Sequence, residues 1–259
     1  MLSFDEAGQS GGKPLILVHG WCCNRRHMAG LFQHFSRSRH VFAVDLPGHG
    51  QTPIQDTPPL MDAFAASLSA FLMERELFNA ILVGHSMGGL LSVLAAGQQS
   101  ERVAGVVSLD GPLPLTAQAR AGYEGLFSRI RAEGYRAVAA RFVREVFFLP
   151  LERGSLCEGI VADMLSLPED LAVALLSQLP TLDVGKALTA CRVPMLCIGG
   201  SFPRFDQAAL ARLRPRAWIA RVALSGHFVQ IFALPQIIAM IEKFLESGVT
   251  ASAAGSDPR

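Results

Sequence analysis

The hydrophobic positions along the chain fall into two alternating patterns. Short, continuous apolar runs rich in β-branched residues alternate with stretches whose apolar residues recur at helical spacing. Continuous apolar runs are typical of strands that helices cover on both faces. The alternation therefore predicts βαβ units in an α/β fold with a mostly parallel, doubly wound sheet. The expected strands span residues 15–18, 41–45, 80–83, 103–109, 195–198 and 218–223.

Helical spacing is clearest in two stretches of the chain. The first contains Leu60, Phe64, Leu68, Phe71 and Leu72, and the second contains Ile237, Ile238, Ile241 and Leu245. Residues spaced by three and four positions share one helix face, so each stretch predicts an amphipathic helix that packs on the sheet.

About eighty residues between the strands at 103–109 and 195–198 contain no convincing strand pattern. So long a departure is too large for a loop within one sheet and predicts an inserted helical cap. The expected cap helices, separated by glycine and proline residues, lie around 116–132, 135–147, 155–166 and 169–178.

These patterns predict how the chain is divided. We expect an α/β core of residues 1–111 and 186–246, with a helical cap of residues 112–185 inserted into it. Residues 247–259 are mostly small or polar, which predicts a frayed tail.

The composition excludes several classes of protein. Half of the 259 residues are hydrophobic, a fraction that excludes a disordered chain. The 23 basic and 22 acidic residues give a net charge of +1, so no broad field attracts nucleic acid or an anionic membrane. No apolar stretch is long enough to span a bilayer, and the N-terminus lacks a basic start followed by an apolar run. We therefore expect a cytoplasmic protein with a small-molecule substrate and with neither nucleic acid nor membrane as a partner.

The cysteines agree with a reducing compartment. They form an odd set without a paired framework: Cys22, Cys23, Cys157, Cys191 and Cys197. No Cys-x-x-Cys pair or His-x-x-x-His cluster indicates a metal site, so we expect neither a metal nor a cofactor. The sequence leaves open whether the protein is a monomer or a homodimer.

The strongest chemical signal is the pentapeptide Gly-His-Ser-Met-Gly at residues 84–88. It follows a predicted strand and precedes a helical run, which is the setting in which a G-x-S-x-G turn presents a nucleophile. The turn lifts the Ser86 hydroxyl off the sheet, and only glycine fits where the strand and helix backbones crowd. The helix that begins at Met87 points its first amides toward the same place. We therefore predict that Ser86 is a nucleophile.

A second signal, His19-Gly20-Trp21, directly follows the predicted strand at 15–18. A strand that ends in a glycine turn can direct a backbone N–H at an oxyanion. We expect the amides of Trp21 and Met87 to form a hole with two donors. The His19 side chain is expected to hold the loop, and the Trp21 side chain to form pocket wall.

A serine hydroxyl needs a neighbouring base, and histidine titrates in the useful range. His227 is the histidine that follows a late strand and lies beyond the serine in the sequence, so we predict that it is the base. His85 adjoins the nucleophile, which places it to line the site but not to act as the base. We expect His27, His34 and His40 in a helix or at its exit, and His49 in a turn, while His19 lies in its own loop.

Four segments together resemble the α/β-hydrolase superfamily. They are VHGW at 18–21, DLPGHG at 45–50, GHSMGG at 84–89 and SGHF at 225–228, and they occur in the family's order along nearly the whole chain. Within the superfamily the chain is similar to small capped bacterial esterases, such as pimeloyl-ester carboxylesterases, and to lactonases, deformylases and enol-lactone hydrolases. The resemblance implies serine-dependent ester or lactone hydrolysis beneath a cap, with the HGW tryptophan amide in the oxyanion hole.

Other members of the superfamily suggest alternatives. Haloalkane dehalogenases and epoxide hydrolases attack through an aspartate, and serine at position 86 argues against both. Cofactor-free dioxygenases share a segment like Gly20-Trp21-Cys22, but they typically lack the glycine that this chain has at position 84. The alternative enzyme is therefore a cofactor-independent dioxygenase or lyase in which His227 deprotonates a bound substrate. A non-catalytic binding module needs neither nucleophile nor base.

Two aspartates are candidates for the acid that orients His227. The family usually places this acid shortly after the glycine that ends the strand before the last, where this chain has Phe202 or Pro203. Asp206 comes later, directly before a helical run, which is the position of a helix N-cap. Asp110 directly follows a predicted strand, where lactonases and deformylases of this fold place their acid. We expect Asp110 to be the acid and keep Asp206 as the alternative.

The cap is expected to close a small pocket over these groups. We expect His85, Phe142, Phe147 and Phe228 to line this pocket. The predicted function is hydrolysis of a small, largely apolar ester, lactone or activated amide through an acyl-enzyme on Ser86.

Overall fold

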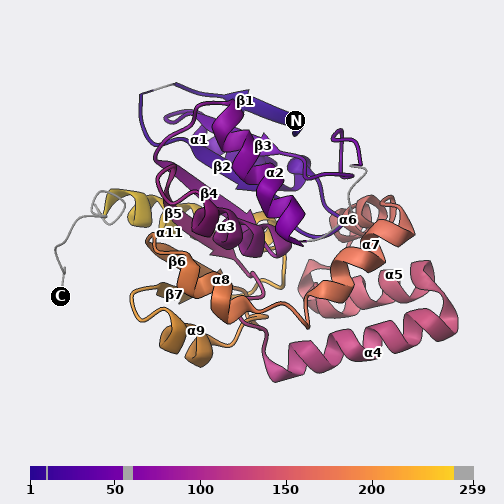
Figure 1. The fold of residues 1–259 in the computed structure, drawn as a ribbon. Coiled ribbons are helices and arrows are strands. Elements are labelled where there is room, and N and C mark those ends of the chain that lie inside the picture. Colours follow the sequence, from indigo (N-terminus) through magenta and orange to yellow (C-terminus); the bar gives the residue numbers. More distant parts are fainter. Residues whose placement is uncertain (10, 55–60, 248–259) are drawn as a thin grey trace.

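The computed structural model describes residues 1–9, 11–54 and 61–247, which form a seven-stranded sheet with helices on both faces (Figure 1). The strand order is β1-β3-β2-β4-β5-β6-β7. β1 (Phe4–Ala7) pairs antiparallel with β3 (Val41–Val44), and every other neighbouring pair is parallel. The predicted fold class is confirmed. The remaining strands are β2 (Leu15–Val18), β4 (Ala80–His85), β5 (Val103–Leu109), β6 (Met195–Gly199) and β7 (Trp218–Arg221).

The strand boundaries agree closely with the apolar runs, and the differences have local causes. The predicted strands at 15–18 and 103–109 match β2 and β5. β4 extends past its apolar run because Gly84 and His85 still pair with Ser108 and Leu109 of β5. β7 ends earlier than predicted, at Arg221, on the edge of the sheet.

Alternate residues of the strands face two separate cores. Leu15 and Leu17 pack with α1 (Ala29–Phe35) and α11 (Leu234–Glu246) on one face of the sheet. Ile16 and Val18 belong to the larger core on the other face, where the covering helices are α2 (Met61–Glu74), α3 (Met87–Gln98) and α8 (Val184–Ala190). This division follows from the two-residue period of a strand.

Both stretches with helical spacing are helical where the structure describes them. Phe64 and Leu68 are buried on α2, and Ile237 and Ile241 are buried on α11. Leu60 and the predicted tail beyond residue 247 lie outside the described residues. Within the described ranges, every helix is too short or too polar to cross a membrane.

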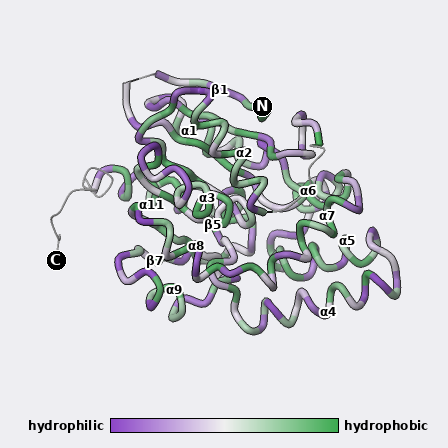
Figure 2. Tube along the Cα trace, viewed as in Figure 1, coloured by the Kyte–Doolittle hydropathy of each residue, from purple (hydrophilic) through white to green (hydrophobic). Residues whose placement is uncertain are grey.

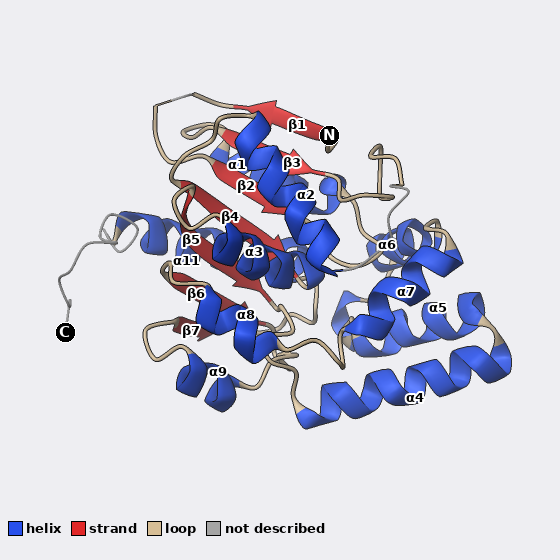
Figure 3. Cartoon of the chain, viewed as in Figure 1, coloured by secondary structure: helices blue, strands red, loops and turns tan. Residues whose placement is uncertain are grey.

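A helical region is inserted between β5 and β6, beyond the end of the sheet to which the parallel strands point (Figure 3). α8, which begins at Val184, packs on α3 of the core. The predicted boundaries of cap and core remain a prediction. In Figure 2, α4 alternates along its length between hydrophilic and hydrophobic residues. The helices that match the predicted cap stretches are α4 (Ala117–Glu133), α5 (Tyr135–Val146), α6 (Ser155–Leu165) and α7 (Glu169–Gln178), with a short 3-10 turn, η2 (Pro150–Glu152).

Three further short helices occur among the described residues. They are η1 (Arg25–Met28), α9 (Gln207–Leu213) and α10 (Val229–Phe232). Reactive groups of open α/β sheets gather at the carboxyl ends of the strands, so we expect the site in the loops after β2, β4, β5 and β7.

Candidate active site

Ser86 occupies the turn between β4 and α3 in a strained backbone conformation. Its φ is 52° and its ψ is −120°, a conformation that non-glycine residues rarely adopt. The Ser86 amide donates to the carbonyl of Leu109, 2.8 Å away, which ties the turn to β5. A Cβ on Gly84 would lie 2.2 Å from the carbonyl oxygen of Gly88, so a side chain at residue 84 is sterically excluded. The local geometry is therefore that of the sharp strand–turn–helix predicted for residues 84–88.

The loop after β2 lies against this turn. A Cβ on Gly20 would lie 3.0 Å from the Cβ of Ser86. Nε2 of His19 accepts a hydrogen bond from the Leu46 amide at 3.0 Å, so Nδ1 carries the proton and donates to the Gly20 carbonyl at 2.8 Å. Burial lowers the pKa of His19 well below its ordinary value, which keeps the ring neutral. His19 thus holds the loop, as predicted from the sequence.

Two backbone amides beside Ser86 have no protein acceptor among the described residues. One belongs to Met87, whose amide at the start of α3 has no partner within the helix. The other belongs to Trp21, which follows Gly20 in the loop packed on Ser86. The Trp21 indole Nε1 donates to the carbonyl of Ala172 on α7, 2.8 Å away, and so links this loop to the cap. The role of these two N–H groups as an oxyanion hole remains a prediction.

His227 and Asp110 form a buried hydrogen-bonded pair. Nδ1 of His227 lies 2.6 Å from Oδ2 of Asp110, and both side chains are at most 4% exposed. A carboxylate can only accept, so Nδ1 carries the proton and Nε2 is the free nitrogen. The second oxygen, Oδ1, accepts from the amides of Gly200 at 3.4 Å and Arg204 at 3.3 Å.

The environment of His227 sets its charge. Burial lowers the pKa of His227 below its ordinary value of 6.5. The hydrogen bond and negative charge of Asp110 act in the opposite direction, and the positive charge of Arg204 acts with burial. The imidazole is therefore neutral at pH 7 and able to accept a proton.

Asp206, the alternative acid, has a different role. Its carboxylate accepts from the Ala209 amide at 2.9 Å and caps α9, as its position before a helical run predicted. Of the two candidate acids, Asp110 is the one hydrogen-bonded to His227. The loop that carries the acid in the usual family pattern instead gives two amides to Asp110, through Gly200 and Arg204.

Three of the four predicted pocket residues have ring contacts with His227, namely His85, Phe147 and Phe228, whereas Phe142 packs on Phe147. Nε2 of His85 lies 3.0 Å from the His227 carbonyl oxygen, so His85 supports the backbone of the base. The Phe147 ring centre lies 4.4 Å from that of His227 and 5.3 Å from that of Phe142. Phe228 is fully buried. Phe147 is therefore the member of this set whose ring lies nearest to that of the base, at a tilt of 35°.

The structure contains two cavities near these groups. The first measures about 280 Å³ and is lined by Asp110, His227 and residues of the cap and of the loop after β6. The second measures about 570 Å³ and lies between η1, α1, α6 and α10. Among the described residues that line the two cavities, none of the four predicted pocket residues occurs. Their role as pocket lining remains a prediction.

A cap residue that sequence reasoning missed holds the loop of the base. Glu152 is 5% exposed, and its Oε1 accepts from the Gly226 amide at 2.9 Å and from the Ser225 hydroxyl at 3.1 Å. Its Oε2 accepts from the Leu149 amide at 2.7 Å. A single glutamate in a short proline-initiated turn carries no sequence signal for such a contact.

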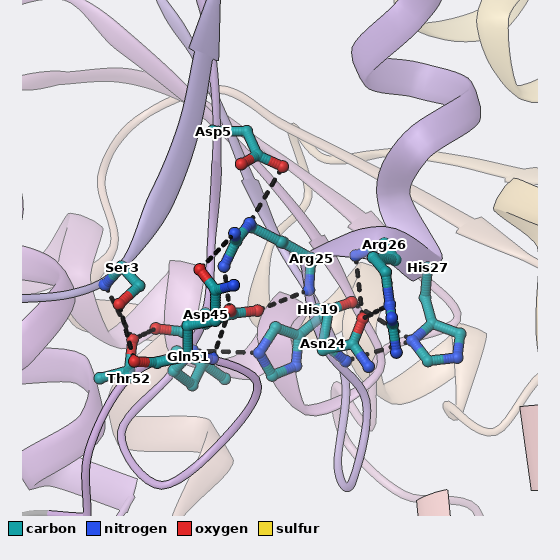
Figure 4. Close-up of polar contacts among 11 residues, drawn as sticks. Ser3, Asp5, His19, Asn24, Arg25, Arg26, His27, Asp45, Gln51 and Thr52 are labelled. Carbon is teal, nitrogen blue, oxygen red and sulfur yellow. Dashed lines mark hydrogen bonds and ion pairs between the residues drawn. The ribbon is translucent and has the colours of Figure 1, made fainter. Parts of the chain in front are cut away.

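A second polar network joins the loop after β2 to the loop after β3 (Figure 4). Asp45 is 1% exposed; its Oδ1 accepts from the Arg25 amide at 2.8 Å, and its Oδ2 forms an ion pair with the Arg25 guanidinium. Oδ2 also accepts from the Gln51 amide at 2.9 Å, and Arg25 pairs with Asp5 at 3.0 Å. The network fixes the segment that carries Trp21. The DLPGHG segment indicated Asp45, but no sequence feature indicated its partner Arg25.

Comparison with known proteins is consistent with this geometry. A family model described as alpha/beta hydrolase fold matches residues 13–233. The chain is 29% identical, over 95% of its length, to the dihydrolipoyllysine-residue acetyltransferase component of the acetoin cleaving system of Pseudomonas putida, of which it spans 66%. It is also 29% identical to the pimeloyl-[acyl-carrier protein] methyl ester esterase of Vibrio cholerae, over 82% of this chain and 83% of the relative.

A solved structure has the same fold. A thermophilic esterase from Thermogutta terrifontis superposes with a TM-score of 0.80 at 23% identity, over 95% of this chain and 93% of the other. At this level of identity the likeness concerns the fold.

Proposed function

The chain belongs to the α/β hydrolase fold family, and on that premise we propose that it is a serine hydrolase. Its substrate class is a small, largely apolar ester, lactone or activated amide, cleaved through an acyl-enzyme on Ser86. The observation that carries the proposal is the 2.6 Å hydrogen bond between His227 and Asp110. The two residues come from different loops at the sheet end where Ser86 occupies its strained turn.

In the proposed reaction the same catalytic groups act first in acylation and again in deacylation. Ser86 Oγ attacks the carbonyl carbon while Nε2 of His227 accepts the hydroxyl proton. The amides of Trp21 and Met87 stabilise the oxyanion, and the collapse of the intermediate expels the alcohol, which takes the proton from His227. Water then attacks the acyl-enzyme with His227 again as base, which releases the acid and restores Ser86.

Asp110 supports this cycle without exchanging a proton. Its carboxylate holds the proton on Nδ1, so Nε2 presents its lone pair to the serine. It also stabilises the imidazolium that forms after proton transfer. The three hydrogen bonds that Asp110 accepts hold its buried carboxylate in place beside the ring.

The named relatives support ester or lactone chemistry. The Vibrio cholerae relative is a methyl ester esterase. The structures with this fold include the Thermogutta terrifontis esterase and an enol-lactonase from Burkholderia xenovorans LB400. An acyl-enzyme on serine serves both substrate types, because a lactone is an intramolecular ester.

An active-site probe tests the nucleophile directly. We expect a fluorophosphonate to add one adduct to the native protein, measured by intact-mass spectrometry, and none to the Ser86→Ala variant. Ser128→Ala, on the exposed face of α4, serves as the matched control and is expected to keep the adduct. An undiminished adduct on Ser86→Ala would refute the proposal.

A substrate series separates hydrolysis from the alternative chemistry. We expect turnover of p-nitrophenyl esters with a short-chain optimum, measured beside a lactone panel. Activity that survives Ser86→Ala but disappears in His227→Ala, with oxygen uptake, would instead indicate a dioxygenase or lyase.

A further inference from the structure

The side chain of Arg204 packs on two aromatic rings close to the candidate base. Its Cζ lies 5.3 Å from the ring centre of Phe147 and 5.7 Å from that of Tyr123. The ring centre of Phe147 in turn lies 4.4 Å from that of His227, with the two rings tilted by 35°. The Arg204 amide donates to Asp110, so the backbone of this residue is anchored to the same pair. These contacts hold the guanidinium close to the base.

Among the residues that the structure describes, no carboxylate forms an ion pair with this guanidinium. Among the described residues, neither an ion pair nor a hydrogen bond engages the Arg204 side chain, and its Nε is buried without a partner. The two aromatic faces attract the cation but provide no hydrogen-bond acceptor. A guanidinium has five N–H donors, and a partly buried one without acceptors is costly unless a ligand supplies them.

The cavity of about 280 Å³ next to His227 is lined by Arg204. The other described charged residues that line the cavity form no ion pair with the Arg204 guanidinium, which can therefore bind a ligand. Both oxygens of Asp110 are already hydrogen-bonded. Glu145 and Arg153 carry opposite charges and are exposed. Among the described residues that line the cavity, Arg204 is therefore the cation that is partly buried without a hydrogen-bond acceptor, whereas Arg153 is exposed to solvent.

We propose that Arg204 binds a carboxylate of the substrate in this cavity, so that the protein acts on short esters or lactones that carry one carboxylate. The proposal rests on the proposed hydrolase function and narrows its substrate class. A guanidinium binds a planar carboxylate through two parallel N–H bonds. The formal charges of the lining residues cancel, and such a site suits one negative charge better than a phosphate dianion.

The size of the cavity limits the substrate. A volume of about 280 Å³ lies at the lower end for small-molecule sites and admits a short chain only. His227 and Arg204 line the same cavity, whereas Ser86 does not, so the substrate carboxylate would bind beside the base and the reacting carbonyl beyond it. The apolar side chains of Phe148 and Leu149 line the space between the charged groups and suit a methylene chain.

A matched pair of esters tests the proposal. The anionic member is mono-p-nitrophenyl glutarate, and the neutral member is its methyl ester. For the native protein we expect kcat/KM for the anionic ester to exceed that for the neutral one by about tenfold, as a charge-assisted bidentate contact implies. Arg204→Met is expected to bring this ratio to about one, and Arg204→Lys to give an intermediate ratio.

Control variants separate this contact from general effects. Arg212→Met, on the exposed surface of α9 and outside the cavity, is expected to keep the native ratio. An ester ending in a phosphonate is expected to show less gain than the carboxylate ester. A native ratio of one or below, or a ratio that Arg204→Met leaves unchanged in a folded variant, would overturn the proposal.

A binding experiment distinguishes failure of this site from failure of the hydrolase function. We expect monomethyl glutarate to bind Ser86→Ala in calorimetry, and its affinity to fall about tenfold when Arg204→Met is added. Absence of esterase activity together with this Arg204-dependent binding would refute the hydrolase function alone. Ester turnover without any Arg204-dependent binding would refute the carboxylate site alone.

Discussion

The imidazole of His227 and the carboxylate of Asp110 lie 2.6 Å apart although 117 residues separate them in the chain. The contact joins the loop after β7 to the end of β5. It brings together a ring whose free nitrogen is Nε2 and a carboxylate whose other oxygen is already held by backbone amides. The tautomer of the ring is therefore set by the protein before any substrate binds.

We predict that Asp110→Asn lowers esterase turnover by up to about 10⁴-fold, because loss of the charge leaves the tautomer and the imidazolium unsupported. Asp206→Asn is expected to keep most of the activity, since asparagine also caps a helix well. Turnover of a p-nitrophenyl ester by both folded variants measures the difference. The opposite ranking would show that the acid is misplaced.

The pH dependence of hydrolysis is expected to follow His227. Protonated His227 cannot accept the serine proton, so kcat/KM should fall as the pH drops through the pKa of His227, which burial holds below 6.5. Arg204→Met removes a positive charge that lowers this pKa and should move the acid limb to higher pH. A pH–rate profile of the neutral ester measures the shift, with Arg212→Met as the unshifted control. A shift to lower pH would contradict the placement of Arg204 beside the base.

Glu152→Ala should destabilise the protein and slow turnover together. The substitution leaves the Gly226 amide, the Leu149 amide and the Ser225 hydroxyl without their acceptor. A buried unsatisfied donor costs about 1–3 kcal/mol of unfolding free energy. Because Gly226 precedes His227, the base also loses part of its support. Urea unfolding and ester kinetics measure the two effects.

Another cap glutamate provides the control for Glu152. Glu158 is exposed and pairs with Arg144 at 2.7 Å on the surface. Glu158→Ala is expected to leave stability and kinetics close to those of the native protein, because exposed ion pairs contribute little. Equal effects of the two substitutions would argue against a specific role for Glu152.

Arg25→Met should affect the loop of the proposed oxyanion hole. It removes the guanidinium from the buried Asp45 carboxylate and breaks one side of a buried pair, which costs about 3 kcal/mol. We expect a lower unfolding free energy and a lower kcat, because the segment before Arg25 carries Trp21. Arg26→Met, whose side chain is 75% exposed, should change neither quantity appreciably. Unchanged stability of Arg25→Met would show that the network does not hold the loop.

Features that depend on neighbouring residues were predicted from the sequence. The strands follow from continuous apolar runs, so β2 and β5 were predicted to the residue. The strained turn at Ser86 was predicted from the glycines two residues away on either side. The crowding at Gly84 is local, since a Cβ there would meet Gly88 and Gly89, whereas the crowding at Gly88 comes from the carbonyls of Val18 and His19 at the end of β2. The N-cap role of Asp206 is equally local.

Features that join distant segments were decided by the tertiary structure. The sequence left two aspartates for His227, and the choice depends on where the ends of β5 and β7 meet. Glu152 and Arg204 had no local pattern at all, since their partners lie in other loops or on cap helices. Local sequence determines backbone conformation through sterics and apolar periodicity. Which side chains share a buried site is determined by packing between elements that are far apart in the chain, and single-sequence patterns carry no record of it.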